Sequence, residues 1–369
     1  MEKNWYHISN IDQIDTPALV VYADRVKQNI QTLLSMAEDA NQLRPHVKTH
    51  KSPDVARLML ENGIRKFKCA TIAEAEMLGQ TGAPDVLIAY PLQGPKINRL
   101  IQLMETYPQT KYTCLVDNLI SANEIAVRGK NHGVVIGVYV DLNVGMNRTG
   151  IIPGQEAIDL IKSIDDMDGI RVMGLHAYDG HIRHPDLEER RKLCDEAFCA
   201  VLEMDRAMQA EGYTLSIVAG GSPTFPIHVR RMNVESSPGT FIYWDKGYEE
   251  TCAEQDFKPA ALVISRVISQ PAPNIFCLDL GHKSIAAENS LDRRIHFLNG
   301  PEMKFLGQSE EHLVVECSDP TALVTGQILY GEPIHICPTV ALYEEVLVCV
   351  KRRITGRWPV TARDRKISI

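Results

Sequence analysis

The segment RPHVKTHKSPD (residues 44–54) places Lys48 at the end of an extended run, shortly before a helix start at Pro53. At the carboxyl end of a parallel strand, a lysine side chain points to the place where active sites of such folds gather. Partial burial lowers the pKa of a lysine amine, which then suits Schiff-base chemistry with an aldehyde. The alternative is a basic loop with solvated side chains, and the segment taken alone favours that interpretation.

A second candidate site is an anion cradle within VAGGSPTF (residues 218–225). Two glycines end a strand-like run, and a serine followed by a proline is a typical helix start. The amides of a first helical turn and the positive end of the helix dipole bind anions such as phosphate. A tight strand–helix turn without any ligand is the alternative. The residues assigned to the cradle, including two from SPGTF after the next run, are Gly220, Gly221, Ser222, Gly239 and Thr240.

Two further loops offer polar side chains after strand-like runs. In DLNVGMNRTG (141–150), Arg148 can pair with a carboxylate or a phenolate through two hydrogen bonds, although an ordinary surface arginine also fits. HAYDGH (176–181) puts His176 and Tyr178 on one face of a strand end, where either can stack on or hydrogen-bond to a planar ring. A pair of satisfied polar groups in the core is the alternative for the second loop.

The segment EPIHICPT (332–339) is the candidate metal site. His335 and Cys337 lie two residues apart on what we predict to be an extended run, so both side chains face the same side. Imidazole and thiolate suit Zn²⁺ or a similar borderline metal. Two protein ligands leave positions for water and substrate, as a catalytic metal requires. A structural zinc usually needs four ligands, and no obvious second pair is present.

The elements that position these residues alternate between Pro17 and about Asp245. Short β-rich runs are separated by helical patterns such as 53–62 and 186–212, and this order is typical of parallel strands with crossovers. Without the first run about eight strand–helix units remain, which predicts an α/β fold with a (β/α)8 TIM-type barrel; a doubly wound open sheet is the alternative. We favour the barrel because polar residues follow nearly every run, and a barrel gathers them at one mouth. The runs are PALVVY (17–22), LRPHVK (43–48), KFKCAT (66–71), DVLIAY (85–90), KYTCLV (111–116), VVIGVYVDL (134–142), VMGLHAY (172–178), SIVAGG (216–221) and MNVESS (232–237).

After about Lys258 the pattern changes to short β-branched runs punctuated by Gly and Pro. This texture predicts a C-terminal, mainly antiparallel β domain. We therefore expect two domains: residues 1–247 as the barrel, with the first residues free to pack on the β domain, and residues 248–369 as the β domain with the metal motif.

Composition limits the possible functions. Of 369 residues, 44% are hydrophobic and 23% charged, values of a globular protein that exclude a disordered chain or a coiled coil. The formal net charge of −8 argues against a nucleic-acid binder. Nine cysteines without a CxxC pair fit reduced thiols in the cytoplasm. The N-terminus lacks a signal-peptide pattern, and no apolar run is long enough for a membrane span.

Taken together, PHVKTHK, MNRTG, HAYDGH, AGGSPT, SPGTF and the late HIC motif resemble the D-threonine aldolase / D-serine dehydratase family. Members of this family are fold-type III pyridoxal-phosphate (PLP) enzymes akin to alanine racemase. The resemblance runs from DTPALVVY to HICPT, nearly the whole chain. It implies an N-terminal PLP-binding barrel, a C-terminal β domain and a homodimer.

The resemblance also implies roles for individual residues. Lys48 carries the internal aldimine, Arg148 lies near the phenolic oxygen of PLP, and Tyr178 lies near its pyridine nitrogen. His335 and Cys337 hold a divalent metal, zinc or manganese, with magnesium as a further candidate. Lys48 and His335 are thus the catalytic candidates. The phosphate-binding positions are Gly220, Gly221, Ser222, Gly239 and Thr240.

The reaction that this resemblance implies is a metal-assisted lyase reaction on a β-hydroxy D-amino acid. We expect a D-threonine aldolase, which yields glycine and an aldehyde. The aldolase branch often carries Asp where this chain has Cys337, so a D-serine or 3-hydroxy-D-aspartate dehydratase, which yields a keto acid and ammonia, is the alternative. An amino-acid racemase gives the HIC pair no role, and a PLP carrier protein resembles the barrel alone.

Overall fold

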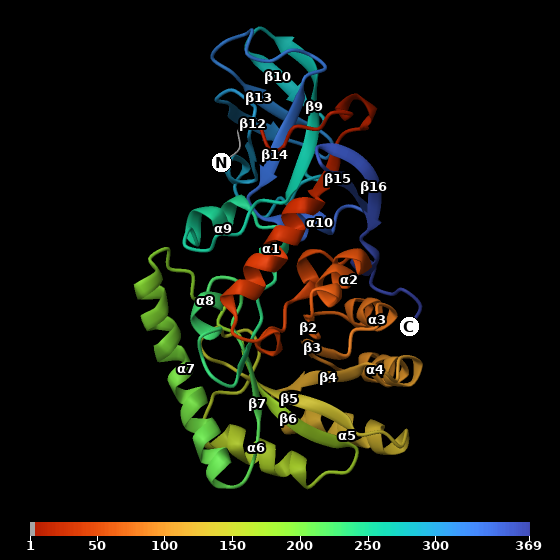
Figure 1. Ribbon diagram of the computed structural model, residues 1–369, viewed down its shortest axis with the longest axis vertical. Coiled ribbons are helices and arrows are strands. Elements are labelled where there is room, and N and C mark those ends of the chain that lie inside the picture. The colour runs from red at the N-terminus through yellow and green to blue at the C-terminus, as the bar shows by residue number, and fades with distance from the viewer. Residues whose placement is uncertain (1–3) are drawn as a thin grey trace. The chain divides into compact units, whose positions relative to one another are not determined.

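The computed structural model describes residues 4–369, which divide into two compact units (Figure 1). The parallel unit comprises residues 33–48, 55–239 and 364–369. The β unit comprises residues 4–32, 49–54 and 240–363. The first strand-like run of the sequence therefore belongs to the same unit as the C-terminal strands, and the later division lies between Gly239 and Thr240.

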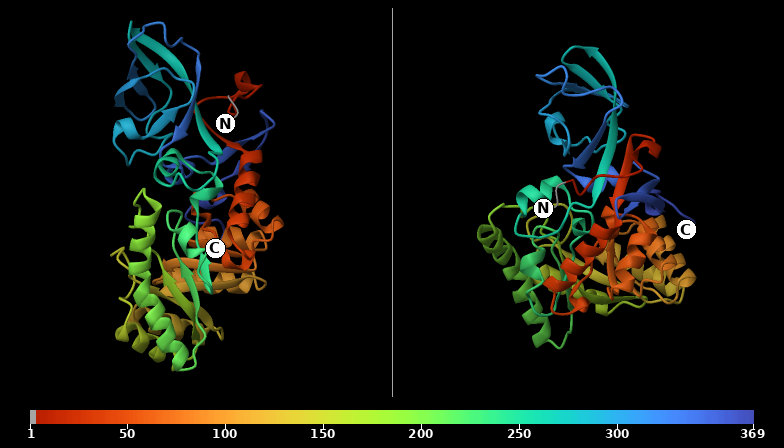
Figure 2. Two further views of the ribbon diagram at one scale, coloured as in Figure 1. Left: turned by 60° about the vertical axis from the view of Figure 1, so that its left-hand side comes forward. Right: turned by 45° about the horizontal axis from the view of Figure 1, so that its top comes forward.

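The parallel unit contains a seven-stranded sheet, all parallel, in the order β2-β3-β4-β5-β6-β7-β8. A helix follows each strand up to β7, and α3–α6 lie along one face of the curving sheet (Figure 2). The strands are β2 (Lys66–Cys69), β3 (Asp85–Pro91), β4 (Lys111–Val116), β5 (Ile136–Leu142), β6 (Ile170–Ala177), β7 (Ser216–Ala219) and β8 (Val234–Ser236). The helices are α2 (Pro53–Glu61), which begins in the β unit, α3 (Ile72–Gln80), α4 (Pro95–Thr106), α5 (Leu119–Asn131), α6 (Gln155–Asp165), α7 (Leu187–Ala210) and α8 (Phe225–His228).

The prediction of a regular strand over residues 43–48 is wrong. Leu43 and His46 form only isolated parallel bridges, to Ser236 of β8 and to Lys68 of β2. Pro45 has no amide hydrogen to donate, and a short 3-10 helix, η3 (Val47–Thr49), begins directly afterwards. Within residues 4–369, no regular eighth strand therefore closes the sheet, whereas the predicted α/β class with parallel strands and following helices is confirmed.

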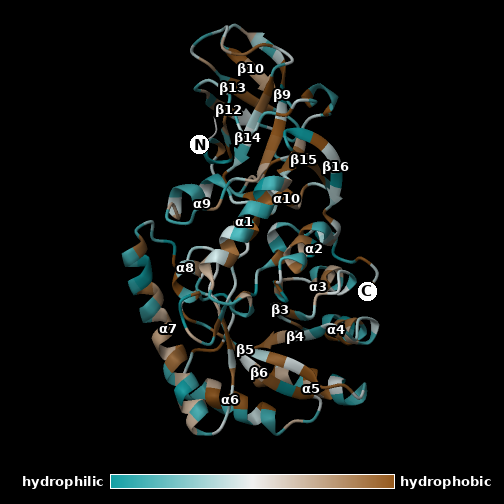
Figure 3. Ribbon diagram, viewed as in Figure 1, coloured by the Kyte–Doolittle hydropathy of each residue, from teal (hydrophilic) through white to brown (hydrophobic). Residues whose placement is uncertain are grey.

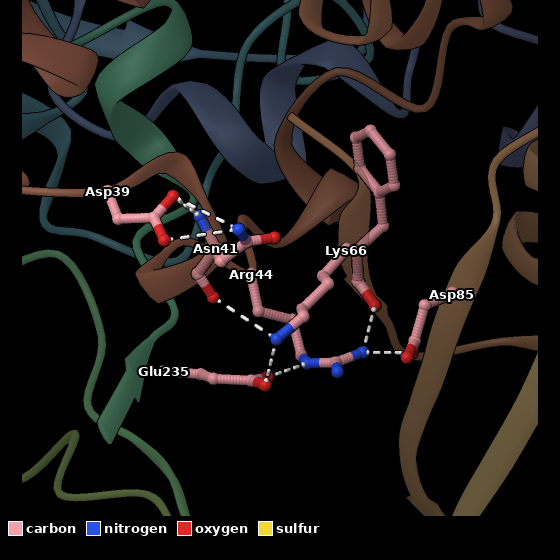
Figure 4. Close-up of polar contacts among 7 residues, drawn as sticks. Asp39, Asn41, Arg44, Lys66, Asp85 and Glu235 are labelled. Carbon is pink, nitrogen blue, oxygen red and sulfur yellow. Dashed lines mark hydrogen bonds and ion pairs between the residues drawn. The ribbon is translucent and has the colours of Figure 1, made fainter. Parts of the chain in front are cut away.

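Ion pairs support the irregular segment instead (Figure 4). The guanidinium of Arg44, only 1% exposed, donates to Asp85 Oδ1 at 2.5 Å and to Glu235 Oε2 at 2.6 Å. Lys66 Nζ lies 2.5 Å from the other oxygen of Glu235. These contacts tie the segment to β3 and β8. Because removing one partner of a buried ion pair leaves an uncompensated charge, we assign this cluster a structural role.

The β unit is built on a nine-stranded, mostly antiparallel sheet, which confirms the predicted β-rich C-terminal region. Strand β1 (Ala18–Tyr22) pairs antiparallel with β9 and parallel with β15. The first residues contribute Ile8 and Ile14 to the apolar core of this sheet, where they pack with Leu262 and Ile264. The other strands are β9 (Ala261–Ala272), β10 (Ile275–Leu278), β11 (Ile295–Phe297), β12 (Lys304–Gln308), β13 (Leu313–Glu316), β14 (Ile328–Pro333), β15 (Glu345–Val350) and β16 (Arg353–Pro359).

Three helices complete this description: α1 (Ala23–Met36), which runs from the β unit into the parallel unit, α9 (Lys246–Thr251) and α10 (Ile336–Val340). In Figure 3 hydrophobic colours concentrate on strands, whereas α7 alternates between hydrophobic and hydrophilic residues. Within residues 4–369, no helix combines the length and the hydrophobicity that crossing a membrane requires.

Candidate active site

Three cationic side chains of the parallel unit gather around the ring of Tyr178, which directly follows β6. Arg148 Cζ lies 4.9 Å from the ring centroid, Lys68 Nζ 5.6 Å and Lys48 Nζ 6.0 Å. The structure therefore brings Lys48, Arg148 and Tyr178 together at the carboxyl ends of the strands. Lys68, at the end of β2, is an addition that the sequence analysis missed.

Lys68 belongs to a buried polar chain. Its Nζ lies 3.4 Å from His176 Nε2, and His176 Nδ1 lies 2.7 Å from Asp141 Oδ1. Thr149 donates to the other oxygen of Asp141 at 2.7 Å. Burial, assisted by the charge of Lys48, lowers the pKa of Lys68 to about 7, although Asp141 acts in the opposite direction. Burial and then the charge of Lys68 lower the pKa of His176.

The predicted anion cradle lies in the loop after β7. Gly220 has φ +78°, and a Cβ on Gly221 would lie 3.0 Å from a ring carbon of Tyr178, so the glycines permit a conformation and an approach that larger residues would disturb. The amide of Gly239 donates to Ser222 Oγ at 3.3 Å. The cradle residues up to Gly239 are thus assembled within the parallel unit, whereas Thr240 belongs to the β unit.

The predicted helix start at Ser222 and Pro223 is wrong. Helix α8 begins at Phe225, with Thr224 as its N-cap, and comprises only 4 residues. The proline at the start of this helix is Pro226, its second residue, and not Pro223. A helix this short provides no dipole site for an anion, so the cradle depends on the amides and the serine hydroxyl of the loop.

A buried network holds this loop in place. Asp179 accepts hydrogen bonds from Thr224 Oγ1 at 2.7 Å and lies 2.8 Å from His228 Nε2. Thr224 Oγ1 in turn accepts from the amide of Gly221 at 3.3 Å. Since Asp179 follows Tyr178 in the chain, the network ties the end of β6 to the loop after β7.

Of the residues the structure describes, only Asp179, Cys194 and His228 bring three potential metal-ligating atoms within 4.8 Å of one another. Burial raises the pKa of the Cys194 thiol to about 12, whereas a metal requires the thiolate. His228 Nδ1 is buried without a hydrogen-bond partner, whereas a metal-bound histidine usually donates from its second nitrogen. The group therefore fits a hydrogen-bonded support for the loop.

The predicted extended run around His335 and Cys337 is wrong, because helix α10 starts there. His335 is the N-cap and Cys337 lies in the first turn, and Asp245 Oδ2 fixes this turn by accepting from the amide of Ile336 at 3.0 Å. The two side chains nevertheless hydrogen-bond to each other. Their proximity thus comes from a helix start and not from strand alternation.

The pair has further polar neighbours in the β unit. His335 Nδ1 lies 2.6 Å from Glu288 Oε1, and Cys337 Sγ lies 3.1 Å from Thr49 Oγ1 and 3.7 Å from Thr240 Oγ1. Burial opposes protonation of His335, but Cys337, Asp245 and Glu288 outweigh it and raise its pKa to about 9. Glu288 orients the imidazole as the outer partner of a metal-binding histidine would. Glu288 has no local signal in the sequence, because it lies 47 residues from His335 along the chain.

Comparison with known proteins agrees with this geometry. Residues 21–246 match the family described as alanine racemase, N-terminal domain, and residues 260–349 match a putative serine dehydratase domain. The chain belongs to the alanine racemase N-terminal domain family. The predicted resemblance to D-threonine aldolases and D-serine dehydratases is also confirmed by the curated relatives of this family.

Two curated members span nearly the whole chain. A 3-hydroxy-D-aspartate aldolase of Paracoccus denitrificans (strain Pd 1222) is 26% identical over 96% of this chain and 93% of its own. A D-threonine aldolase of Arthrobacter sp. is 27% identical over 95% of this chain and 93% of its own. Among solved structures, D-threonine aldolase from Filomicrobium marinum has a TM-score of 0.88 at 27% identity and covers 95% of both chains.

A dehydratase shares the fold. D-threo-3-hydroxyaspartate dehydratase from Delftia sp. HT23 has a TM-score of 0.81 at 22% identity, covering 94% of this chain and 97% of its own. Two further structures of that protein carry alanine in place of a histidine and in place of a cysteine two positions later, and the cysteine variant is described as the metal-free form. His335 and Cys337 have the same spacing in this chain.

Proposed function

We propose that the protein is a PLP- and divalent-metal-dependent lyase acting on β-hydroxy D-amino acids, with aldol cleavage to glycine and an aldehyde as its reaction. The single observation that carries this proposal is the amine of Lys48, 6.0 Å from the Tyr178 ring, in the same unit as a glycine-lined cradle. The names of the aldolases that align with nearly the whole chain support it.

The residues of the parallel unit fit PLP. Lys48 would hold the cofactor covalently by condensing its amine with the aldehyde carbon, with loss of water. Arg148 would pair with the phenolic oxygen, and Tyr178 would lie beside the ring. Bound PLP supplies an electron sink for the electron pair released at the substrate α-carbon. The cradle residues of this unit, Gly220, Gly221, Ser222 and Gly239, would hold the phosphate. Thr240, the fifth predicted position, belongs to the β unit.

In the β unit, His335 and Cys337 fit a divalent metal, because an imidazole and a sulfur atom meet there with Glu288 behind the imidazole. Zinc or manganese would act as a Lewis acid for the β-hydroxyl of the substrate. The chemistry of this donor pair is the observation behind the assignment, and the metal-free cysteine variant of the dehydratase supports it.

Dehydration of D-serine or 3-hydroxy-D-aspartate is the second candidate reaction. The observation that favours it is the cysteine at position 337, since the related dehydratase also has a cysteine two positions after a histidine. A racemase is less well supported, because it gives this pair no role.

We further propose a cytoplasmic homodimer. The nine cysteines, with no CxxC pair among them, fit a reducing compartment. Leu119, Ile120 and Val127 expose apolar surface on α5, which fits a contact with a second copy of the chain.

The test begins with an absorption spectrum of the protein loaded with PLP. We expect a band at about 420 nm that borohydride abolishes, as a covalent lysine link to PLP predicts. Peptide mass mapping after reduction should place the pyridoxyl group on Lys48, and Lys48→Ala should lack the band. Lys130→Ala, at an exposed lysine of α5, is the control. A pyridoxyl group on another lysine contradicts the assignment of Lys48.

The reaction is tested by incubating the loaded protein and Mn²⁺ or Zn²⁺ with D-threonine, D-serine and 3-hydroxy-D-aspartate. Glycine with an aldehyde or glyoxylate supports aldol cleavage. A keto acid and ammonia without glycine contradict it and support dehydration. Loss of turnover on adding EDTA distinguishes both reactions from racemisation.

A further inference from the structure

Lys68 is a second lysine in the candidate active site, and its amine is nearly enclosed. The residue is 2% exposed. Among residues 4–369, the structure gives its ammonium one hydrogen-bond partner, His176 Nε2 at 3.4 Å. A lysine ammonium has three donors, so two of them have no acceptor among the described residues.

The charges around Lys68 are unbalanced. The cations of Lys48 and Arg148 face the same Tyr178 ring, at 6.0 Å and 4.9 Å from its centroid. Both lie close enough to oppose the charge of Lys68 electrostatically. The ring itself is uncharged and offers these cations only the weak attraction of its π face.

Two buried carboxylates act in the opposite direction, but other donors already occupy their oxygens. Asp141 lies at hydrogen-bond distance from His176 and Thr149. Asp179 accepts from Thr224 and contacts His228. Neither carboxylate forms a hydrogen bond with the Lys68 amine, so within residues 4–369 the positive charge near Tyr178 has no dedicated counter-ion.

A buried cation without a paired anion destabilises the folded protein, and burial lowers the pKa of Lys68 to about 7. A bound anion would supply the missing partner and a charge-assisted hydrogen bond. The phosphate of PLP has its own candidate cradle at Gly220–Ser222, so a different acidic oxygen is required here.

We propose, on the basis of the function proposed above, that Lys68 is an anion-binding residue of the active site that holds an acidic organic oxygen. The phenolic oxygen of the cofactor and the carboxylate of the amino-acid substrate share this chemistry. These two oxygens are distinguished by measuring the affinities for cofactor and substrate separately.

The experiment uses the full chain with Lys68→Met, which removes the charge and keeps a side chain of similar length. The dissociation constant of PLP is measured by absorbance, and that of D-serine by its spectral change on the loaded protein. We expect one of them to rise about tenfold or more, as loss of a hydrogen bond to a charged group predicts. A rise for PLP identifies the cofactor oxygen. A rise for D-serine alone identifies the substrate carboxylate.

The melting temperature of the cofactor-free protein distinguishes a ligand-binding role of Lys68 from a structural one, because the two roles predict changes of opposite sign. If Lys68 serves a ligand, the methionine variant melts at a higher temperature than wild type, because an unpaired buried cation is removed. If Lys68 serves the fold, the variant melts lower. Lys130→Met, with the same change at an exposed site, should leave all three measurements unchanged. Lys68→Gln, which retains donors without charge, should give intermediate constants.

Unchanged constants for both ligands in Lys68→Met and Lys68→Gln overturn this inference, whatever the melting temperatures. The proposed function survives that result if the wild type still holds PLP in a borohydride-reducible form. A wild-type protein that takes up no PLP overturns both proposals.

Discussion

Each unit contains a buried ionisable side chain whose pKa is shifted strongly towards the neutral form, and the charged forms of these two side chains have opposite signs. In the parallel unit, burial lowers the pKa of Lys68 to about 7, with the charge of Lys48 acting in the same direction. In the β unit, burial raises the pKa of Glu332 on β14 to about 8, with Glu249 acting in the same direction. Desolvation disfavours the charged form in both cases.

The charged groups around the two candidate sites also differ in sign between the units. The parallel unit gathers cations around Tyr178, whereas near His335 and Cys337 the β unit gathers acidic groups, Asp245 and Glu288. The first environment favours an anionic organic ligand and the second a metal cation. Under the proposed function, the parallel unit would hold the cofactor and the β unit the metal.

The largest expected effect is a loss of turnover in Cys337→Ala, which tests the metal-binding role of the β unit separately from the cofactor-binding role of the parallel unit. Cys337→Ala removes one of two proposed protein ligands, and we expect turnover to fall about a hundredfold or more because the Lewis acid is lost. Metal content after dialysis should fall with it, while the absorption of bound PLP should stay as in wild type. Cys199→Ala, at an exposed cysteine, is the matched control. If Cys337→Ala retains the metal content of wild type, Cys337 is not a metal ligand, and the proposed difference between the two units is wrong.

The second effect is the pH dependence of stability that Lys68 contributes. Its ordinary pKa is 10.5, and its pKa in the folded protein is about 7. Between these values the unfolded chain binds more protons, so raising the pH through this range stabilises the folded, cofactor-free protein by up to about 5 kcal/mol. Below pH 7 the whole penalty remains. The measurement is the free energy of unfolding of wild type minus that of Lys68→Met, which should rise from about pH 7 to 10. A difference that stays constant contradicts a buried, charged Lys68.

The sequence predicted the strand ends of the parallel unit well, because apolar runs and crossovers are local patterns. It also identified Lys48, Arg148 and Tyr178, whose motifs are contiguous. Lys68 escaped notice because the alternation in KFKC resembles a half-exposed strand, whereas in the structure Phe67, Lys68 and Cys69 are all buried. The partnership of Glu288 with His335 depends on the folding of the β unit and has no local signal.

Two errors share one physical cause. The segment around Pro45 and the segment around His335 were both expected to be extended, and each instead turns into a short helix. Short elements gain little from their own hydrogen bonds, so tertiary contacts decide them. Arg44 holds the first segment through Asp85, and Asp245 holds the second through the amide of Ile336.

An effect no larger than that at Lys68 is expected at Glu332, where burial and the charge of Glu249 outweigh the opposing charges of Lys246 and Arg25. Its ordinary pKa is 4.5 and its pKa in the folded protein is about 8. Between these values the folded state binds more protons, so raising the pH lowers the stability of the folded protein, by up to about 5 kcal/mol. Glu332→Gln, which cannot ionise, should become more stable relative to wild type as the pH rises from about 5 to 8. Glu302→Gln, at an exposed glutamate of the same unit, should show no such trend.

Between about pH 7 and 8 the contributions of Lys68 and Glu332 have opposite signs. In wild type they cancel in large part, so the slope of stability with pH in this window is left to other groups such as His335, whose raised pKa of about 9 makes stability fall as the pH rises. Relative to wild type, Lys68→Met should then lose stability across this window as the pH rises, since the Glu332 contribution is no longer offset. Glu332→Gln should gain stability relative to wild type across the same window. If both single variants keep the slope of the wild type, the two buried charges are not the opposed pair that distinguishes the units, because neither would then titrate where its surroundings require.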